Sequence, residues 1–353
     1  MNRTINMMSS ADKVKGQGVL SAYEEQVALV KKNLGEYDVR INEVKFADIM
    51  HYHTIDLKHF LSLPFIKIAS TTVGYVHFLP ETLENSIKLP RFAKKVFYKY
   101  VIAFYKSMDY LVTVNPYFID KLVKYGIDRE KITYIPNYVS SEKFFKYDKS
   151  KKNLLRKKYE IDKNKFVVLT VGQLQTRKGI FDLIEIAKKM PDIEFVWAGG
   201  FSFKAISDGY EEIKKIVKNP PQNVKFLGIV PREEMNNIYN MSDVMFLPSY
   251  EELFPMTVLE SASCKIPMLL RDIDLYKGIL DGYYLKANNN QEFINELKKL
   301  KEDVVYYNKA SQMSERCNKY YSEENVTSMW RAYYNRIYKI NKKRKKWRKL
   351  NEI

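Results

Sequence analysis

Residues 248–260 read PSYEELFPMTVLE and combine the end of a strand, an acidic loop and the start of a helix. Pro255 suits the first helical position, so the amides that follow it would point out of the helix end toward an anion such as a diphosphate. Glu252 lies in the loop and Glu260 about one and a half turns into the helix, where carboxylates can accept hydrogen bonds from sugar or ribose hydroxyls. The alternative is a plain helix start with two solvated acids. On the first interpretation the ligand-facing residues are Glu252, Phe254, Pro255, Met256, Thr257 and Glu260.

A second segment with the character of a ligand site is FVVLTVGQLQTRKG, residues 166–179. Its apolar, β-branched run predicts a strand, which a turn and a helix from Phe181 follow. Open α/β sheets bind ligands at the carboxyl ends of their strands, so Lys178 in this turn is our first choice for a phosphate contact. The alternative is a surface turn with two solvated cations, Arg177 and Lys178.

Strands and helices alternate along the second half of the chain. Short apolar strands are expected at residues 193–200, 224–228 and 243–248, with helical stretches between them. This alternation predicts an α/β fold with parallel sheets covered on both faces. At 353 residues and 46% hydrophobic content, the chain can build two cores. The lysine-rich stretch 141–165 separates them, and the expected domains are residues 1–148, residues 149–322, and a final helix with a basic tail, residues 323–353.

The two glutamates, followed by SASCKIP at residues 261–267, resemble the signature of family 4 retaining glycosyltransferases. The resemblance implies the GT-B fold, in which two Rossmann-like domains face each other across a cleft and the C-terminal helix crosses back to the N-terminal domain. It implies that Glu252 lies against the donor hexose and that Glu260 holds the ribose. Family members more often have Gly where Pro255, Cys264 and Lys265 stand, and Arg where Gln173 stands. The other donor-site residues that it implies are Gln173, Arg177, Lys178 and Ile229, the last beside the uracil ring.

Two glycines, Gly16 and Gly18, follow a short expected strand at residues 4–9. Glycines let a backbone approach a ligand closely, although a simple tight turn explains the pair equally well. The family resemblance implies that this loop faces the donor phosphates or the acceptor.

All four histidines lie between residues 51 and 77. His51 and His53 alternate along an expected strand and share a face, but no nearby cysteine or carboxylate has metal-ligand spacing, which argues against zinc. The resemblance implies that His77 contacts the donor sugar and joins Glu252 and Lys178 as a catalytic residue. No Asp-x-Asp string stands at a suitable strand end, so no metal or other cofactor is expected.

The net charge of +17 is concentrated in two places. Residues 85–108 carry six cations and no acid, and residues 331–353 carry ten cations and one acid. Cations interleaved with aromatic rings on an expected helix, residues 91–108, suit the head-group region of an anionic bilayer. Nucleic acid is the competing partner, but no recognised binding module for it is readable, and the paired glutamates would then have no role. The expected membrane-binding residues are Arg91, Lys94, Lys95, Tyr98, Lys99, Tyr105 and Lys106.

Two features predict where the protein works. Cys264 and Cys317 lie far apart and fit a reduced compartment, and no run reaches the length of a signal peptide or a membrane span. We therefore expect a cytoplasmic protein that is peripheral on the inner face of the cell membrane.

Further strings resemble those of the glycolipid synthases of Gram-positive bacteria, within family 4. They are SSADKVKGQG at residues 9–18, HYHTID at 51–56 and GYVHFLPE at 74–81. The resemblance implies retaining transfer of a hexose, with galactose expected, from a UDP-sugar to α-monoglucosyl-diacylglycerol, which makes the diglycosyl lipid that anchors lipoteichoic acid. The alternative is the preceding step, glucose transfer to diacylglycerol.

Overall fold

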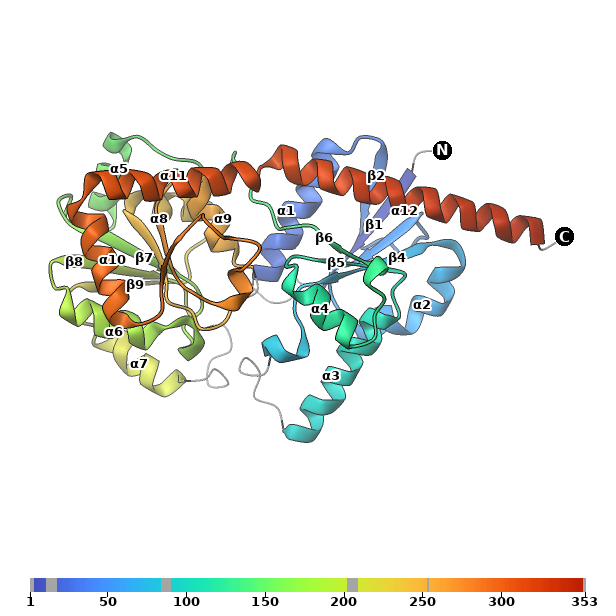
Figure 1. The fold of residues 1–353 in the computed structure, drawn as a ribbon, viewed down its shortest axis with the longest axis horizontal. Coiled ribbons are helices and arrows are strands. Elements are labelled where there is room, and N and C mark those ends of the chain that lie inside the picture. The colour runs from blue at the N-terminus through green and yellow to red at the C-terminus, as the bar shows by residue number, and fades with distance from the viewer. Residues whose placement is uncertain (1–2, 11–17, 84–89, 202–208, 253, 352–353) are drawn as a thin grey trace. The chain divides into compact units, whose positions relative to one another are not determined.

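The computed structural model of the chain describes residues 3–10, 18–83, 90–201, 209–252 and 254–351. The chain forms two compact units, drawn in Figure 1. Unit 1 comprises Met1–Leu83, Leu89–Tyr138 and Glu323–Ile353, and unit 2 comprises Glu84–Lys88 and Val139–Ser322.

Unit 1 is built on a six-stranded parallel sheet in the order β2-β1-β3-β4-β5-β6. Every residue of β3 and β4 is buried, as expected for strands with helices on both faces. The register is set by pairs such as Ile5 with Val39 on one side and Ile49 on the other. The strands are β1 (Arg3–Met8), β2 (Tyr37–Ile41), β3 (Ile49–Tyr52), β4 (Thr71–Val76), β5 (Tyr110–Thr113) and β6 (Ile132–Tyr134). The helices are α1 (Gly18–Asn33), α2 (Leu57–Ala69), α3 (Arg91–Lys106), α4 (Tyr117–Lys124) and α12 (Glu323–Asn351).

The last helix, α12, belongs to unit 1, although the whole of unit 2 precedes it in the sequence. It packs on α1, where Gln26 Nε2 donates to the Tyr334 hydroxyl at 3.3 Å. The Trp330 ring is 1% exposed and stacks on Tyr334 with ring centroids 5.2 Å apart. The predicted return of the C-terminal helix to the N-terminal domain is therefore confirmed, and Figure 1 shows α12 running along this unit.

Unit 2 contains the second six-stranded parallel sheet, in the order β12-β11-β10-β7-β8-β9. The chain builds outward from β7 through β8 to β9 and then returns to the other side of β7 with β10. The strands are β7 (Phe166–Val171), β8 (Ile193–Ala198), β9 (Val224–Gly228), β10 (Val244–Leu247), β11 (Met268–Arg271) and β12 (Leu285–Ala287). The helices are α5 (Lys149–Lys158), α6 (Ile180–Lys189), α7 (Tyr210–Lys218), α8 (Met235–Met241), α9 (Met256–Ser263), α10 (Asn290–Glu302) and α11 (Val304–Tyr320).

The boundary between the units lies ten residues earlier than the sequence suggested, after Tyr138 rather than after residue 148. The intervening segment is tied to α8 of unit 2. The Phe145 amide donates to Asn236 Oδ1 at 3.1 Å, and the Tyr147 amide donates to Asn240 Oδ1 at 2.6 Å. These side-chain hydrogen bonds give no periodic signal that a sequence could display.

Among the described residues, no helix combines the length and the apolar character that crossing a bilayer requires.

Candidate active site

The loops that follow β7 and β10 meet at the carboxyl edge of the unit 2 sheet. These strands are neighbours, but the strand that follows β7 in the chain, β8, and the strand that follows β10, β11, lie on opposite flanks of the pair. Open α/β folds bind ligands at such a point, where the strand order reverses. Lys178, in a 3-10 turn after β7, and Glu252, in the loop after β10, form an ion pair there through Nζ and Oε1. The structure thus brings together the two residues that the sequence singled out independently.

A glycine allows this close approach of the two loops. Gly179 follows Lys178 with φ at +76°, a left-handed conformation that residues with a side chain rarely adopt. A Cβ at this position would lie 2.5 Å from the carbonyl oxygen of Pro248. The Tyr250 amide also donates to the Arg177 carbonyl at 2.8 Å, so the basic turn and the acidic loop are joined through their backbones.

The ion pair is largely removed from water. The Lys178 side chain is 13% exposed and that of Glu252 is 6% exposed. Burial lowers the pKa of Lys178, and the nearby Arg177 adds to this, while Glu252 opposes the shift. Beside the pair, burial raises the pKa of Tyr276, and the Glu252 carboxylate raises it further. Within the described part of the chain, the Tyr276 hydroxyl has no hydrogen-bond partner, so the site holds a buried polar group that a ligand can satisfy.

Glu260 is fixed by two side chains that the sequence analysis did not identify. It is 2% exposed, Oε1 accepts from Arg232 Nη1 at 2.6 Å, and Oε2 accepts from the Tyr239 hydroxyl at 2.6 Å. Burial and the Glu260 charge raise the pKa of Tyr239, so it stays a hydrogen-bond donor. Each carboxylate oxygen retains a further lone pair for a ligand hydroxyl. Arg232 is a cation in the polar turn that follows β9, and nothing else in the sequence marked it as a partner of Glu260.

The start of α9 differs in detail from expectation. Pro255 lies just before the helix, which begins at Met256, and the Val258 amide already donates to the Pro255 carbonyl at 3.1 Å. The amides of Met256 and Thr257 therefore remain as the donors at this helix start that can face an anion. The Phe254 ring is buried against Tyr321, with centroids 5.2 Å apart, so only its backbone can face a ligand.

The remaining donor residues predicted in unit 2 lie at the same sheet edge. Gln173 is the second residue after β7, and Ile229 directly follows β9 and is 68% exposed. The Arg177 guanidinium does not project freely, because Nη1 donates to the Glu251 carbonyl at 3.2 Å.

His77 lies in unit 1, directly after β4, in a stack of aromatic rings. Its ring stacks on Tyr75 with centroids 4.3 Å apart, and Tyr75 stacks on His53 at 5.1 Å. Burial lowers the pKa of His77 to about 3. Its Nε2 has no hydrogen-bond partner among the described residues, so a neutral imidazole is available to a sugar hydroxyl. The described residues contain no group of three or more His, Cys, Asp or Glu side chains that could hold a metal ion.

Two glycines of unit 1 were predicted to face a ligand. Gly16 lies outside the described residues, and Gly18 is the first residue of α1. The preceding Ser10 hydroxyl donates to Asp56 Oδ1 at 2.6 Å, and Thr54 donates to the other oxygen of the same carboxylate. Burial raises the pKa of Asp56, but these hydrogen bonds outweigh it and lower the pKa below its usual value. No motif in the sequence predicted this polar cluster.

The basic face of α3 is largely as expected. Lys95, Lys99 and Lys106 are exposed, whereas Lys94 and Tyr98 are half-buried. The side chain of Arg91 lies outside the description. Tyr105 requires a correction, because it is 1% exposed and its hydroxyl donates to the Phe78 carbonyl at 3.0 Å, which makes it a core residue.

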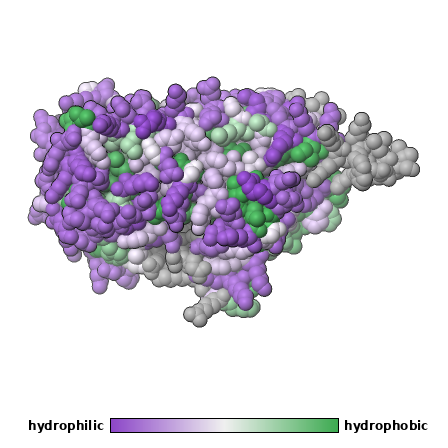
Figure 2. Space-filling view, viewed as in Figure 1, coloured by the Kyte–Doolittle hydropathy of each residue, from purple (hydrophilic) through white to green (hydrophobic). Residues whose placement is uncertain are grey.

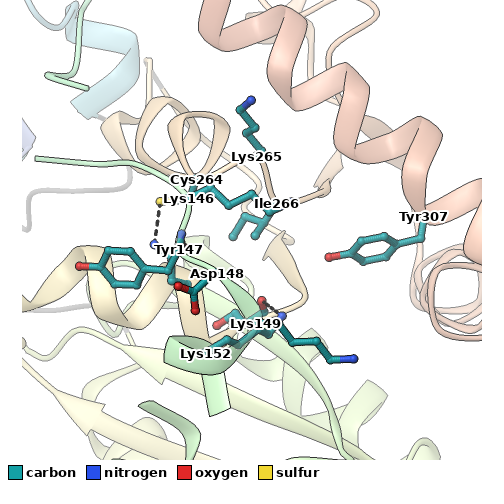
Figure 3. A pocket seen from close by; sticks show the side chains of 11 residues that line it. Lys146, Tyr147, Asp148, Lys149, Lys152, Cys264, Lys265, Ile266 and Tyr307 are labelled. Carbon is teal, nitrogen blue, oxygen red and sulfur yellow. Dashed lines mark hydrogen bonds between the residues drawn. The ribbon is translucent and has the colours of Figure 1, made fainter. Parts of the chain in front are cut away.

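A separate pocket in unit 2, shown in Figure 3, lies away from these residues. Its lysines are partly engaged, since Lys152 pairs with Asp243 at 2.6 Å and Lys265 pairs with Glu315 at 2.6 Å. None of the predicted site residues lines it. Its lining residues are Lys146, Tyr147, Asp148, Lys149, Lys152, Asn240, Ser242, Cys264, Lys265, Ile266 and Tyr307.

Comparison with protein families gives two matches that together span most of the chain. The model described as "Glycosyl transferases group 1" matches residues 151–320, and the model described as "Glycosyltransferase Family 4" matches residues 41–143. Among curated proteins, the alpha-galactosylglucosyldiacylglycerol synthase of Streptococcus pneumoniae is 43% identical over 96% of this chain and 91% of its own length. The processive diacylglycerol alpha-glucosyltransferase of Acholeplasma laidlawii is 28% identical over 72% of this chain and 75% of its own.

Solved structures share the fold at low sequence identity. The sucrose-phosphate synthase of Thermosynechococcus elongatus has a TM-score of 0.78 at 14% identity, covering 96% of this chain and 100% of its own. HepE of Anabaena, in complex with UDP-glucose, has a TM-score of 0.74 at 15% identity, covering 92% of this chain and 97% of its own. The predicted fold of two Rossmann-like domains is confirmed.

Proposed function

Because this chain belongs to glycosyltransferase family 4, as its sequence predicted, we propose that it transfers galactose from UDP-galactose to α-monoglucosyl-diacylglycerol with retention of configuration. The 43% identity to the S. pneumoniae synthase over nearly the whole chain is the observation that carries this proposal. The product would be a diglycosyl-diacylglycerol, the kind of lipid that anchors lipoteichoic acid.

In this proposal the donor diphosphate is held by Lys178 and by the amides of Met256 and Thr257. These donors, with Arg177 nearby, stabilise the negative charge that grows on UDP as the bond to the sugar breaks. The Lys178 and Glu252 pair supports this role, because a buried cation whose partner is a single carboxylate can turn toward an arriving phosphate. No step requires a metal ion, and no cofactor is proposed.

The sugar and the nucleoside are held by carboxylates and by a neutral imidazole. Glu252 orients the hexose, Glu260 accepts from the ribose hydroxyls, and His77 contacts the transferred sugar. Arg232 and Tyr239 orient Glu260, with contacts of 2.6 Å each. The uracil ring lies beside the backbone of Ile229, and Gln173 lies beside the diphosphate. Gly16 and Gly18 face the donor or the acceptor.

We further propose that the enzyme works on the cytoplasmic surface of the cell membrane as a peripheral protein. The acceptor's acyl chains lie in a bilayer, so the enzyme must approach one. Lys94, Lys95, Lys99 and Lys106 on α3 supply positive charge near that surface, where each cation contributes on the order of 1 kcal/mol on anionic lipid. Arg91 and Tyr98 extend the same helix, and nucleic acid is not proposed as a partner.

A second candidate is glucose transfer from UDP-glucose to diacylglycerol, which the similarity to the A. laidlawii enzyme supports. The two are separated by assaying transfer of radiolabelled sugar from UDP-galactose or UDP-glucose to vesicles that contain diacylglycerol or α-glucosyl-diacylglycerol. Product only from UDP-galactose and the glucosylated lipid is the result we expect. Product from UDP-glucose on bare diacylglycerol would move the enzyme one step earlier, and no product from any pairing would refute both.

A further inference from the structure

Helix α2 presents an apolar stripe to solvent. Leu57, Leu61, Phe65 and Ile68 are 59%, 65%, 70% and 69% exposed. Their spacings of four, four and three residues place all four on one side of the helix, while His59 and Leu63 face the interior. The stripe is about 16 Å long at 1.5 Å per residue. We refer to these four residues as the α2 stripe.

The α2 stripe is more than a scatter of exposed hydrophobic residues. Single exposed leucines are ordinary, but large apolar side chains that adjoin one another on a surface mark an interaction site. The other exposed positions of α2 are Lys58 and Pro64, so no acid interrupts the stripe. Figure 2 shows that hydrophobic groups form isolated areas on the largely hydrophilic face that it presents. A continuous apolar line on a helix therefore differs from the face that Figure 2 presents.

Helix α2, which carries the stripe, packs on the cationic helix α3. The Phe60 ring of α2 lies 5.6 Å from the Tyr100 ring and 6.2 Å from the Phe104 ring of α3, centroid to centroid. Between them, the two helices carry seven cations and no acid. The N-terminal part of α3 also exposes Phe92, at 81%, and Val96. Apolar groups thus lie among cations on both helices.

We propose that the α2 stripe inserts into the acyl-chain boundary of a lipid bilayer while the lysines of α3 contact its head groups. This inference rests on the proposed function, because an enzyme whose acceptor is a diacylglycerol lipid must reach a bilayer. The acids beside α2 are Asp56, which is the N-cap residue of the helix, and Asp109, which pairs with Lys67 at 3.3 Å. The chemistry favours lipid over a protein partner, since apolar side chains next to a helix whose charged residues are all cations suit the interface of an anionic membrane. The stripe adds a hydrophobic contribution to binding that salt does not screen.

The first test is a depth measurement with Phe65→Trp and the control Val304→Trp. Val304, on α11 of unit 2, is 71% exposed and so matches Phe65 in accessibility. Each protein is mixed with anionic vesicles that contain no donor sugar, and the spectrum of the unsubstituted protein is subtracted. We expect a blue shift and quenching by lipids brominated on the acyl chain for Phe65→Trp only. An unchanged spectrum for Phe65→Trp on vesicles that bind the protein would overturn the proposal.

The second test measures binding of Leu61→Ser/Phe65→Ser/Ile68→Ser to vesicles at high salt by co-sedimentation. Burying one large apolar side chain is worth about a factor of ten or more, so we expect the variant to bind at least ten-fold more weakly than the unsubstituted protein. Val304→Ser should bind normally. Since the substituted residues are exposed, the melting temperature should stay unchanged, and the activity on detergent-dispersed acceptor should change less than two-fold. Equal binding of the triple variant and the unsubstituted protein at high salt would contradict the proposal.

Two other outcomes are informative. If the unsubstituted protein were a dimer without lipid and the triple variant a monomer, the stripe would be an interface between copies and the lipid proposal would be wrong. If the stripe binds vesicles but no galactose is transferred in detergent, the proposed reaction fails while the membrane contact stands.

Discussion

Lys178 and Glu252 are 74 residues apart in the chain and form an ion pair at the carboxyl edge of the unit 2 sheet. Each lies in a loop that follows one of two adjacent parallel strands. The pair therefore exists only when β10 lies beside β7, which links the geometry of the proposed donor site to the folding of the sheet.

Removing one partner of this pair should cost more stability than removing both. Glu252→Leu leaves a buried ammonium without its counter-charge, and we expect a loss of about 3–5 kcal/mol. Adding Lys178→Met removes that uncompensated charge and should restore most of the loss, although neither variant should retain transfer activity. Urea unfolding of the single and double variants measures the difference. A double variant as unstable as the single one would mean that the pair is not the source of the effect.

The hydroxyl of Tyr239 should affect nucleotide binding through Glu260. Tyr239→Phe removes a 2.6 Å hydrogen bond to a buried carboxylate, and such bonds to charged groups are worth about 1.5–3 kcal/mol. We expect UDP to bind about ten-fold more weakly, and Glu260→Ala to weaken it further. Isothermal titration with UDP gives both values. Unchanged UDP affinity in Tyr239→Phe, with an intact fold, would argue against a positioning role.

The histidine cluster predicts that unit 1 loses stability in acid. Burial lowers the pKa of His51 and His77 to about 3, and that of His53 falls well below its usual value. The unfolded chain, with pKa values near 6.5, binds protons first as the pH falls, so the stability present above about pH 6.5 is lost between pH 6.5 and about 3. Within that range the loss approaches roughly 1.4 kcal/mol per histidine per pH unit. Thermal unfolding at pH 7.5 and 5.5 should show it, and His53→Phe should reduce the slope.

Neutralising the cations of α3 should lower transfer activity on vesicles more than on detergent-dispersed acceptor. Lys94→Gln/Lys95→Gln/Lys99→Gln removes three charges worth about 1 kcal/mol each, and we expect roughly a hundred-fold loss of transfer on anionic vesicles at low salt. Lys214→Gln/Lys215→Gln/Lys218→Gln on α7 removes the same charge from unit 2 and serves as the matched control. Equal losses on vesicles and on detergent-dispersed acceptor would contradict the membrane role of α3.

Trp330 should be essential to unit 1 but not to unit 2. Trp330 is 1% exposed, and its ring centroid lies 5.6 Å from that of His51 and 5.9 Å from that of Tyr75. Trp330→Ala should destabilise unit 1 by about 3–5 kcal/mol. Hydrogen exchange resolved by peptide should show faster exchange in β3 and β4 and unchanged exchange in β7 and β8. Uniformly faster exchange in both units would show that they unfold together.

The short apolar runs between helical stretches predicted the strands well, because a parallel strand that is buried on both faces is apolar throughout. The run expected at residues 193–200 is β8, Ile193–Ala198, and that at 243–248 is β10, Val244–Leu247. The loops that carry Lys178 and Glu252 were predictable one at a time, since each followed such a strand. Their contact was not, because it depends on which strands pair.

Arg232, Tyr239 and the α2 stripe escaped prediction for a common physical reason. A cation in a polar loop looks the same whether it is solvated or bound to a buried carboxylate. Leucine, phenylalanine and isoleucine at helical spacing are usually core residues, and only the neighbouring elements decide whether that side of the helix is covered. Tyr105 is the converse, since it lies on a basic helix and yet faces the core.

The return of α12 to unit 1 has a consequence for biosynthesis. Domains commonly fold in order from the N-terminus as a chain leaves the ribosome. Here the first sheet to be translated lacks Trp330 and Tyr334 until unit 2 has been made, so we expect unit 2 to complete its fold first. A chain that ends before residue 323 would carry all of unit 2 but would lack the helix that completes unit 1. The surface that we propose contacts the membrane would therefore belong to the unit that is completed last.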